Sequence, residues 1–587
     1  MNFIKRVLST VTGIFLFLII CCLGLIVLGV LFGSNSEDLV QVKNNSVLEL
    51  KLDFSIKDYA GKTVFEAYPF LNHDEKNGLF NIIDAINYAA VDDKIKGISI
   101  DNNFIDAGIS QTKALRKALM NFKESGKFIV AYADIYTQKD YYLSSVADTV
   151  FMNPAGMMEF KGLSSEQLYF KNFQEKTGLK MEVVRFGKYK SAVEPFLENE
   201  MSEANREQVE VFLNSIWSEI KSEISESRGI STEQLNIIAD SLLARNATLA
   251  QQAKLIDKIA YHDEYLAGLK KATGTEPSKK QEMVSIFDYA EYAATNMLTD
   301  YSKNKIAVIY AEGEIIYGEG DEGAVGQGVM TKSLQEARNN DKIKAVVLRI
   351  NSPGGSALAS ELIWREIELT KKIKPVIVSM GNVAASGGYY IACNADKIVA
   401  EPTTITGSIG VFGMLPNGNA LATNMGINAE QVSTNKNSVT YSFFEPLNDA
   451  QHDFIKEEII SIYELFTGRV AEGRGMEQDA VKEIAQGRVW TGSDALKIGL
   501  VDELGGLDLA LKYAAEAAGI SEYNIKEFPI YKRDLDKILR QFGLAEAKED
   551  IMKDELGEEA YNLLKQVKTT TQRKGIQLLL PYNVDIK

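Results

Sequence analysis

The chain reads Asp93-Lys94-Ile95-Lys96-Gly97 and then, 248 positions later, Asp341-Lys342-Ile343-Lys344-Ala345. Further matches keep this offset of 248: Tyr141-Tyr142 with Tyr389-Tyr390, Ala147-Asp148 with Ala395-Asp396, Pro154 with Pro402, and Gly178 with Gly426. Later the offset drifts to 251, where Glu194-Pro195 matches Glu445-Pro446, which indicates a small insertion. Chance does not supply this many matches in one register, so the sequence predicts a duplicated unit.

Both copies alternate short apolar runs with helical stretches. The runs 95–100 and 128–132 recur as 343–350 and 376–379, while 113–125 and 357–372 have helical composition. This alternation is typical of an α/β fold with a largely parallel sheet covered by helices. We therefore predict a first copy at 45–268, a linker at 269–304, a second copy at 305–521 and a helical tail at 522–587.

The amino terminus predicts a membrane anchor. Lys5 and Arg6 precede residues 11–32, which are almost wholly Val, Ile, Leu, Phe, Gly and Cys. About 20 such residues cross the hydrocarbon core of a bilayer, and a buried core helix of this length is rarely apolar on every face. The segment 1–36 is thus expected to be a cytoplasmic tip and one transmembrane helix. The positive-inside rule then puts the rest of the chain outside the cytoplasm.

Composition excludes several function classes. Asp plus Glu total 80 against 64 Lys plus Arg, a net charge of −16, which argues against a nucleic-acid binder. Of the three Cys, Cys21 and Cys22 lie in the apolar run, so neither a disulfide framework nor a cysteine zinc site is available. With only three His in the chain, a hydrolytic mechanism is expected to use another base.

Two glycine-rich signals occur in the second copy only. One is Asn351-Ser352-Pro353-Gly354-Gly355-Ser356, a turn after a strand; the other is Ala384-Ala385-Ser386-Gly387-Gly388-Tyr389. Exposed backbone N–H groups at such a turn suit an anion or a reaction oxyanion, and small neighbours expose the Ser386 hydroxyl as a nucleophile. Ordinary structure also explains each signal, as a glycine turn or a serine N-cap. At the same offset, however, the first copy has Gln138 in place of Ser386 and Asp106-Ala107 in place of the glycine pair.

The first copy contains a lysine that can serve as the base for this serine. Lys190 lies in Tyr189-Lys190-Ser191-Ala192-Val193-Glu194-Pro195-Phe196, and at the offset of 251 the second copy has Tyr441 in its place. A Ser-Lys pair needs a lysine that burial keeps neutral. The alternative is an ordinary surface lysine, but the complementary losses in the two copies favour the pair Ser386 and Lys190.

Together with Thr406-Gly407-Ser408-Ile409-Gly410, these motifs make the sequence resemble the long, duplicated form of the signal peptide peptidase A (protease IV) family. That family belongs to the superfamily of Clp protease and crotonase. The resemblance implies two tandem Clp-protease/crotonase-like domains of β-β-α spiral type, preceded by the anchor. It also implies that Ser386 is the nucleophile, Lys190 the general base, and Ser408 a residue that positions the lysine amine.

The implied activity is that of a membrane-anchored serine endopeptidase. It would degrade signal peptides and other hydrophobic peptides, as a homotetramer on the outer face of a bacterial cytoplasmic membrane, in contact with lipid. Backbone N–H groups near Gly354, Gly355 and Gly387 would hold the oxyanion, and no metal or cofactor is needed. Two alternatives remain open at this point: a crotonase-like acyl-CoA enzyme, which shares the oxyanion turn, and a catalytically silent membrane scaffold.

Overall fold

The structure is a computed structural model of the whole chain. It describes residues 40–64, 73–74, 78–297, 302–532 and 576–579, with isolated positions at 13, 16, 17, 20 and 561. The predicted transmembrane segment 11–32 therefore lies outside the described residues, four isolated positions aside. Within the part of the chain that is described, no helix combines the length and the apolar character that a membrane span requires.

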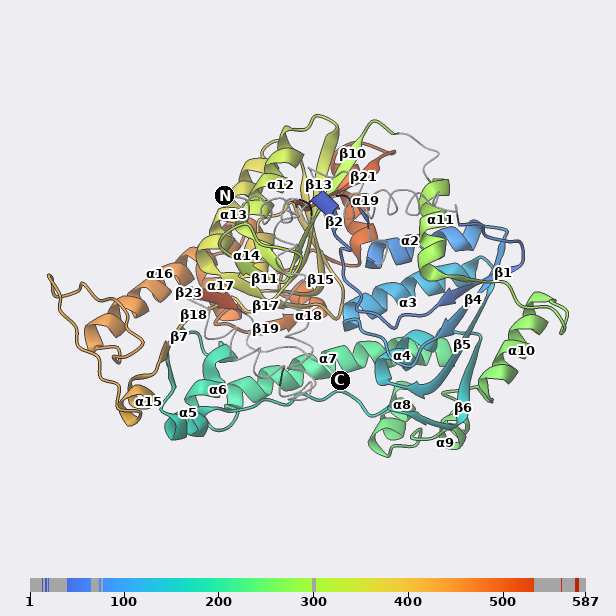
Figure 1. Ribbon diagram of the computed structural model, residues 1–587, viewed down its shortest axis with the longest axis horizontal. Helices are drawn as coiled ribbons and strands as arrows, with labels where there is room; N and C mark the ends of the chain where they lie inside the picture. The colour runs from blue at the N-terminus through green and yellow to red at the C-terminus, as the bar shows by residue number, and fades with distance from the viewer. Residues whose placement is uncertain are drawn as a thin grey trace, which may run out of the picture.

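The first copy is built on a six-stranded parallel sheet, on the right in Figure 1. Its strand order is β8 (Lys258–Ile259), β6 (Thr149–Met158), β5 (Phe128–Tyr136), β4 (Ile95–Asp101), β1 (Ser46–Leu50) and β9 (Met283–Ser285). The helices of this copy are α2 (Leu79–Val91), α3 (Ile109–Glu124), α4 (Gln138–Ser144), α7 (Glu203–Arg228), α8 (Thr232–Asp240), α9 (Ala247–Gln252), α10 (His262–Thr273) and α11 (Ile286–Met297). One apolar core joins all of these helices except α10, whose buried Tyr265 and Leu269 pack in a second, smaller cluster.

The second copy repeats this plan around an eight-stranded sheet. Its main path is β19 (Val489–Thr491), β17 (Ile405–Gly407), β15 (Val376–Ala385), β13 (Ile343–Ser352), β10 (Lys305–Glu312) and β21 (Asn524–Phe528), with β16 (Lys397–Ala400) and β20 (Glu503–Leu504) to one side. Its helices are α12 (Gln327–Asn339), α13 (Ala357–Lys371), α14 (Gly387–Ala392), α16 (Asp449–Arg474), α17 (Gln478–Ile484), α18 (Gly492–Lys497) and α19 (Leu507–Ala517). β13 is buried on both faces over most of its length, and its centre, residues 345–348, is wholly apolar.

The predicted duplication is confirmed by the elements themselves. β4 and β13 begin 248 positions apart, at Ile95 and Ile343, and so do α3 and α13. The long helices α7 and α16 each have 26 residues. The chain is therefore a mixed α/β protein with two repeated domains.

A third sheet joins the two copies. β7 (Lys180–Phe186) of the first copy runs antiparallel to β18 (Val411–Asn417) of the second, with Phe186 opposite Val411. The full order is β12 (Ala324–Gly326), β11 (Glu314–Ile316), β14 (Gly354–Ser356), β23 (Ile576–Leu579), β18 and β7. Two short helices flank β7, α5 (Lys171–Thr177) and α6 (Glu194–Leu197), and α15 (Asn419–Asn424) follows β18. In Figure 1 this part of the first copy lies beside the second, and α7 runs back along the bottom of the molecule.

One predicted segment is folded differently from the expectation, and another is described only in part. The stretch 269–304, predicted as a linker, contains β9 and α11, because apolar side chains such as the buried Tyr289 pack against the first sheet. Of the tail 522–587, predicted as helical, the described residues form the strands β21, β22 (Ile530–Lys532) and β23 and one helical position, Tyr561; the remaining residues, 533–560, 562–575 and 580–587, lie outside the described residues. β21 forms because it adds a parallel strand to the edge of β10. β22 joins a small sheet with β2 (Lys62–Val64) and β3 (His73–Asp74).

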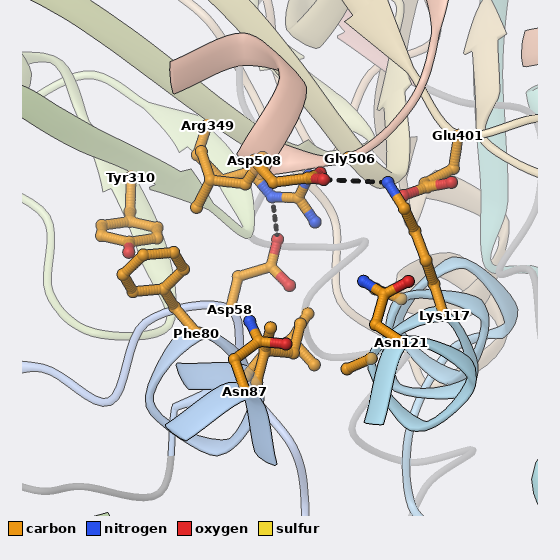
Figure 2. A pocket seen from close by; sticks show the side chains of 15 residues that line it. Asp58, Phe80, Asn87, Lys117, Asn121, Tyr310, Arg349, Glu401, Gly506 and Asp508 are labelled. Atoms are coloured by element: carbon orange, nitrogen blue, oxygen red, sulfur yellow. Dashed lines mark hydrogen bonds and ion pairs between the residues drawn. The ribbon is translucent and has the colours of Figure 1, made fainter. Parts of the chain in front are cut away.

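A buried ion pair fastens the copies to each other (Figure 2). Arg349 on β13 donates from Nε to Asp58 Oδ2 at 2.7 Å, and both side chains are almost fully buried. Gln111 of α3 donates to the other oxygen of Asp58 at 2.9 Å. The loop before α2 is therefore held against the second sheet by a fully hydrogen-bonded carboxylate.

Candidate active site

Ser386 lies at the sharp turn between β15 and α14. Its φ of 57° and ψ of −114° are rarely adopted by a residue other than glycine, so the surrounding structure must hold this turn. The Ser386 N–H donates to the Gly407 carbonyl at 2.8 Å. A Cβ on Gly388 would lie 2.6 Å from the Ser352 carbonyl oxygen, so only glycine lets α14 begin this close to β13.

Lys190 reaches Ser386 because β7 is paired with β18. After β7 the chain turns at Gly187, whose φ is 113°, and the Lys190 N–H donates to the Gly187 carbonyl at 3.3 Å. Lys190 precedes a short 3-10 helix, Ser191–Val193, and its side chain enters the second copy. The two residues that the sequence predicts as a pair are thus brought together within one chain.

The lysine amine has three close partners. Lys190 Nζ lies 2.8 Å from Ser386 Oγ, 3.0 Å from Ser408 Oγ and 3.1 Å from the Ser408 carbonyl oxygen. All three residues are 0% exposed. Burial alone lowers the pKa of the Lys190 amine well below its usual value, because the charged form loses its hydration. The site therefore favours a neutral amine in contact with a serine hydroxyl.

Ser408 is positioned by its own unusual backbone. It follows β17 with a φ of 51°, and its N–H donates to the Arg488 carbonyl at 2.7 Å. This conformation brings both its carbonyl oxygen and its hydroxyl to the same amine. The predicted contact between Ser408 and Lys190 is present.

The three glycines predicted near the oxyanion lie together but differ in their contacts. The Gly354 N–H donates to Ser352 Oγ at 3.2 Å, and Gly355 is paired in β14 with strands on both sides. Gly387 is the first residue of α14, where N–H groups have no helical acceptor. Its nitrogen lies 2.7 Å from the position that a Cβ on Gly354 would take. The Gly387 nitrogen therefore borders the space beside Gly354.

A strand from the tail lies in that space. β23 runs antiparallel to β14 on one side and to β18 on the other, with Leu578 opposite Gly355 and Gln577 opposite Phe412. The Leu578 side chain is fully buried in the core of the second copy. Its carbonyl oxygen lies 2.1 Å from the Cβ position of Gly354, so a side chain there would exclude the strand. The slot beside Gly387 thus accepts an extended apolar peptide segment.

Comparison with known proteins agrees with this geometry. Residues 121–276 and 368–521 match the family model of Peptidase family S49. Protease 4 of Haemophilus influenzae is 38% identical over 499 residues, 83% of this chain and 81% of that protein. Protease 4 of Salmonella typhi is 36% identical over 475 residues, 79% and 76% of the two chains. The chloroplastic serine protease SPPA of Arabidopsis thaliana is 37% identical over 440 residues, 74% and 64% of the two chains.

The chain belongs to peptidase family S49. It is a serine protease, and the resemblance predicted from the motifs is confirmed. The first matched segment of this S49 peptidase includes Lys190, and the second includes Ser386 and Ser408. The duplication thus divides the buried trio between the two family domains.

Sequence reasoning missed several residues that shape the site of this S49 peptidase. Gly487 touches the lysine backbone: a Cβ there would lie 2.6 Å from Lys190 Cβ and 2.7 Å from its nitrogen. The neighbouring Gln486 has a φ of 55°, and its carbonyl accepts from the Tyr189 N–H at 2.9 Å. The sequence signal for this contact was one glycine in each segment, Gly187 and Gly487. The two glycines lie about 300 positions apart in the sequence, so the signal is not visible locally. The apolar run 576–580 was the signal for β23.

Other polar and titratable side chains of the S49 peptidase lie away from Ser386. The cavity in Figure 2 is lined by Asp58, Arg349, Glu401 and their neighbours at the junction of the copies, and neither Lys190 nor Ser386 contributes to its lining. His262 pairs with Asp101 at 2.9 Å on the first copy. These groups therefore do not take part in the arrangement around Ser386.

Proposed function

We propose that this S49 serine protease hydrolyses peptide bonds through an acyl-enzyme, with Ser386 as nucleophile and Lys190 as general base. One observation carries the proposal: the fully buried Lys190 amine lies 2.8 Å from the Ser386 hydroxyl, within the distance of a direct proton transfer. Desolvation keeps that amine neutral and able to accept the proton.

The hydrogen-bond inventory of the amine supports this direction of transfer. A neutral amine has two N–H groups and one lone pair. The carbonyl oxygen and the hydroxyl of Ser408 can accept from the two N–H groups, at 3.1 and 3.0 Å. The lone pair is then left for the O–H of Ser386, so Ser408 would orient the base.

The surroundings of Ser386 support the next steps. Attack of Ser386 Oγ on the substrate carbonyl breaks the C=O double bond and puts negative charge on its oxygen, while the hydroxyl proton moves to Lys190 Nζ. The Gly387 N–H, with the backbone near Gly354 and Gly355, would hold that oxyanion. Lys190 then returns the proton to the leaving amine, and water hydrolyses the ester with the same base.

The placement of β23 supports a binding mode for the substrate. An extended peptide in the same slot would pair its backbone with β14 on one side and β18 on the other. Because backbone pairing is independent of side chains, selectivity would come from apolar positions equivalent to the buried Leu578. Hydrophobic peptides, including signal peptides after their release, are the substrate class that fits this slot.

The apolar run 11–32 and the basic Lys5 and Arg6 support a membrane location. We propose a single-pass anchor in a bacterial cytoplasmic membrane, with both domains on the outer side. There they would meet apolar peptides that remain in or near the lipid. Assembly as a homotetramer, implied by the resemblance to signal peptide peptidase A, completes the proposal.

The pair is tested with a fluorophosphonate probe on the full-length wild type and on Ser386→Ala and Lys190→Met. We expect labelling at Ser386 in the wild type, none in Ser386→Ala, and a loss of at least about 100-fold in rate in Lys190→Met. Hydrolysis of an apolar peptide should fall in parallel. Wild-type labelling in Lys190→Met would reject the lysine as the base.

A further inference from the structure

Gln208 connects the lysine turn of the first copy to the second copy. It lies in the first half of α7, is 1% exposed, and donates from Nε2 to the Tyr189 carbonyl at 3.2 Å and to Ser191 Oγ at 2.9 Å. These two acceptors belong to the residues on either side of Lys190. A third contact, to Asn205 Oδ1 at 3.1 Å, steadies the amide from its own helix.

The other end of the amide contacts β19, the neighbour of the strand β17 that holds Ser386. The Val489 N–H of β19 donates to Gln208 Oε1 at 3.3 Å. Val489 lies opposite Gly407 of β17, and the Gly407 carbonyl accepts the Ser386 N–H at 2.8 Å. The residue before Val489 is Arg488, whose carbonyl holds the Ser408 N–H. One buried side chain thus touches both neighbours of the base and the strand β19, which pairs with the strand that holds the Ser386 N–H.

The chemistry of glutamine suits this place. A primary amide offers donors to one copy and an acceptor to the other without adding a charge. A neutral group matters because an opposite charge near a lysine raises the pKa of the amine. Charged groups near this junction include Arg185, which donates to the Lys190 carbonyl at 3.5 Å, and Arg488, which pairs with Glu207 at 3.1 Å. The buried Glu194 also lies here, and its Oε1 accepts the N–H of Ser202, the N-cap of α7, at 2.6 Å.

We propose that Gln208 is a positioning residue for the hydrolytic step: by joining Tyr189 and Ser191 to β19, it sets where the Lys190 amine lies relative to Ser386. The inference rests on the proposed Ser386 and Lys190 pair. Gln208 touches no reacting atom, so its effect is on the rate of the chemical step. A misplacement of about 1 Å between reacting groups can cost about 100-fold in rate.

The test compares Gln208→Met with Ser215→Ala in the full-length protein. Ser215 lies two turns further along α7, and its hydroxyl contacts Thr491 Oγ1 of the same strand at 2.9 Å, but no contact reaches Lys190 from it. Both variants therefore remove a hydrogen bond between α7 and β19. For Gln208→Met we expect kcat on an apolar peptide to fall about 10- to 100-fold with KM within about twofold of wild type. Ser215→Ala should keep both constants within about twofold.

A second variant separates positioning from simple support of the fold. Gln208→Glu keeps the length and the acceptor for Val489 but removes the donors and adds a carboxylate, so the rising limb of kcat/KM should move to higher pH. Gln208→Met and Gln208→Glu both retaining wild-type kcat and pH profile would overturn the proposal, as would a fall in kcat that Ser215→Ala reproduces. Lys190→Met measured alongside separates the two questions: wild-type activity in that variant would reject the base itself.

Discussion

The amine of Lys190 and the hydroxyl of Ser386 lie 2.8 Å apart, although 196 positions separate them and each belongs to a different copy of the repeated domain. The contact depends on β7 of the first copy, which pairs with β18 of the second copy in the third sheet. Each copy has lost what the other retains, since Gln138 and Tyr441 occupy the equivalent places. The site is therefore assembled from residues of both copies of the duplicated domain.

The rate of hydrolysis should depend on pH through Lys190. As a base it must be neutral, so kcat/KM should rise with pH as the amine loses its proton. Because burial lowers the pKa of this amine, the midpoint should lie well below the ordinary lysine value of about 10.4. The measurement is kcat/KM against pH with an uncharged peptide, with circular dichroism as the control for folding. A midpoint near the ordinary value would contradict the assignment.

Removing the base should stabilise the fold. The unfolded chain binds a proton at Lys190 at neutral pH, whereas the folded chain holds the amine neutral. Unfolding therefore takes up a proton, and the free energy of unfolding of the wild type rises with pH up to the ordinary lysine pKa. Lys190→Met should be more stable by about 1–4 kcal/mol at neutral pH, with an advantage that shrinks as pH rises. Urea unfolding of both proteins at several pH values checks the sign, and a less stable variant would refute it.

Local patterns in the sequence predicted the repeat and the pair, because the offset compares one copy directly with the other. The sequence alone shows two differences between the copies: Gln138 stands in the place of Ser386, and Tyr441 in the place of Lys190. The glycines at 354, 355 and 387 were found for the same reason. Their separate contacts were not, since the Gly354 N–H reaches Ser352 through a turn geometry that composition does not encode.

The parts of the fold that sequence patterns missed depend on contacts between segments that lie far apart in the sequence. Residues 524–528 form a strand because they pair with β10, which lies more than 200 positions earlier in the chain. Gln208 looks like any polar residue on a helix until α7 is placed against β19. The same holds for β11, β9 and the tail strand β23, which have few residues of their own to signal a strand.

Glycine at position 487 should be essential to the lysine turn. Gly487 has a φ of 80°, and a Cβ would lie within 2.7 Å of three Lys190 atoms. Gly487→Ala should lower both stability, by about 2–4 kcal/mol, and kcat. The matched control is Gly475→Ala: its φ is 62°, but the Cβ has open space, so only the backbone cost of about 1 kcal/mol is expected. Equal stability losses and equal kcat in the two variants would show that Gly487 is not constrained by Lys190.

The buried ion pair between the copies should contribute far more to stability than the exposed pair beside it. Asp58→Ala leaves Arg349 buried without its carboxylate and should lower the free energy of unfolding by about 3–5 kcal/mol. Lys117 and Asp508, also drawn in Figure 2, lie 2.8 Å apart with side chains 51% and 64% exposed. Lys117→Ala should therefore cost no more than about 1 kcal/mol. Chemical denaturation of both variants checks the contrast, and similar losses would contradict it.

Removing the tail strand should free the slot beside Gly387 for substrate. β23 and an extended peptide would use the same backbone groups of β14 and β18, so the two compete. A chain that ends at residue 570 should hydrolyse a short apolar peptide with a lower KM and a similar kcat, because the catalytic groups are untouched. A chain that lacks only 583–587 keeps β23 and serves as the control, with wild-type constants expected. If the shorter chain folds but has an unchanged or higher KM, the strand does not occupy the substrate position.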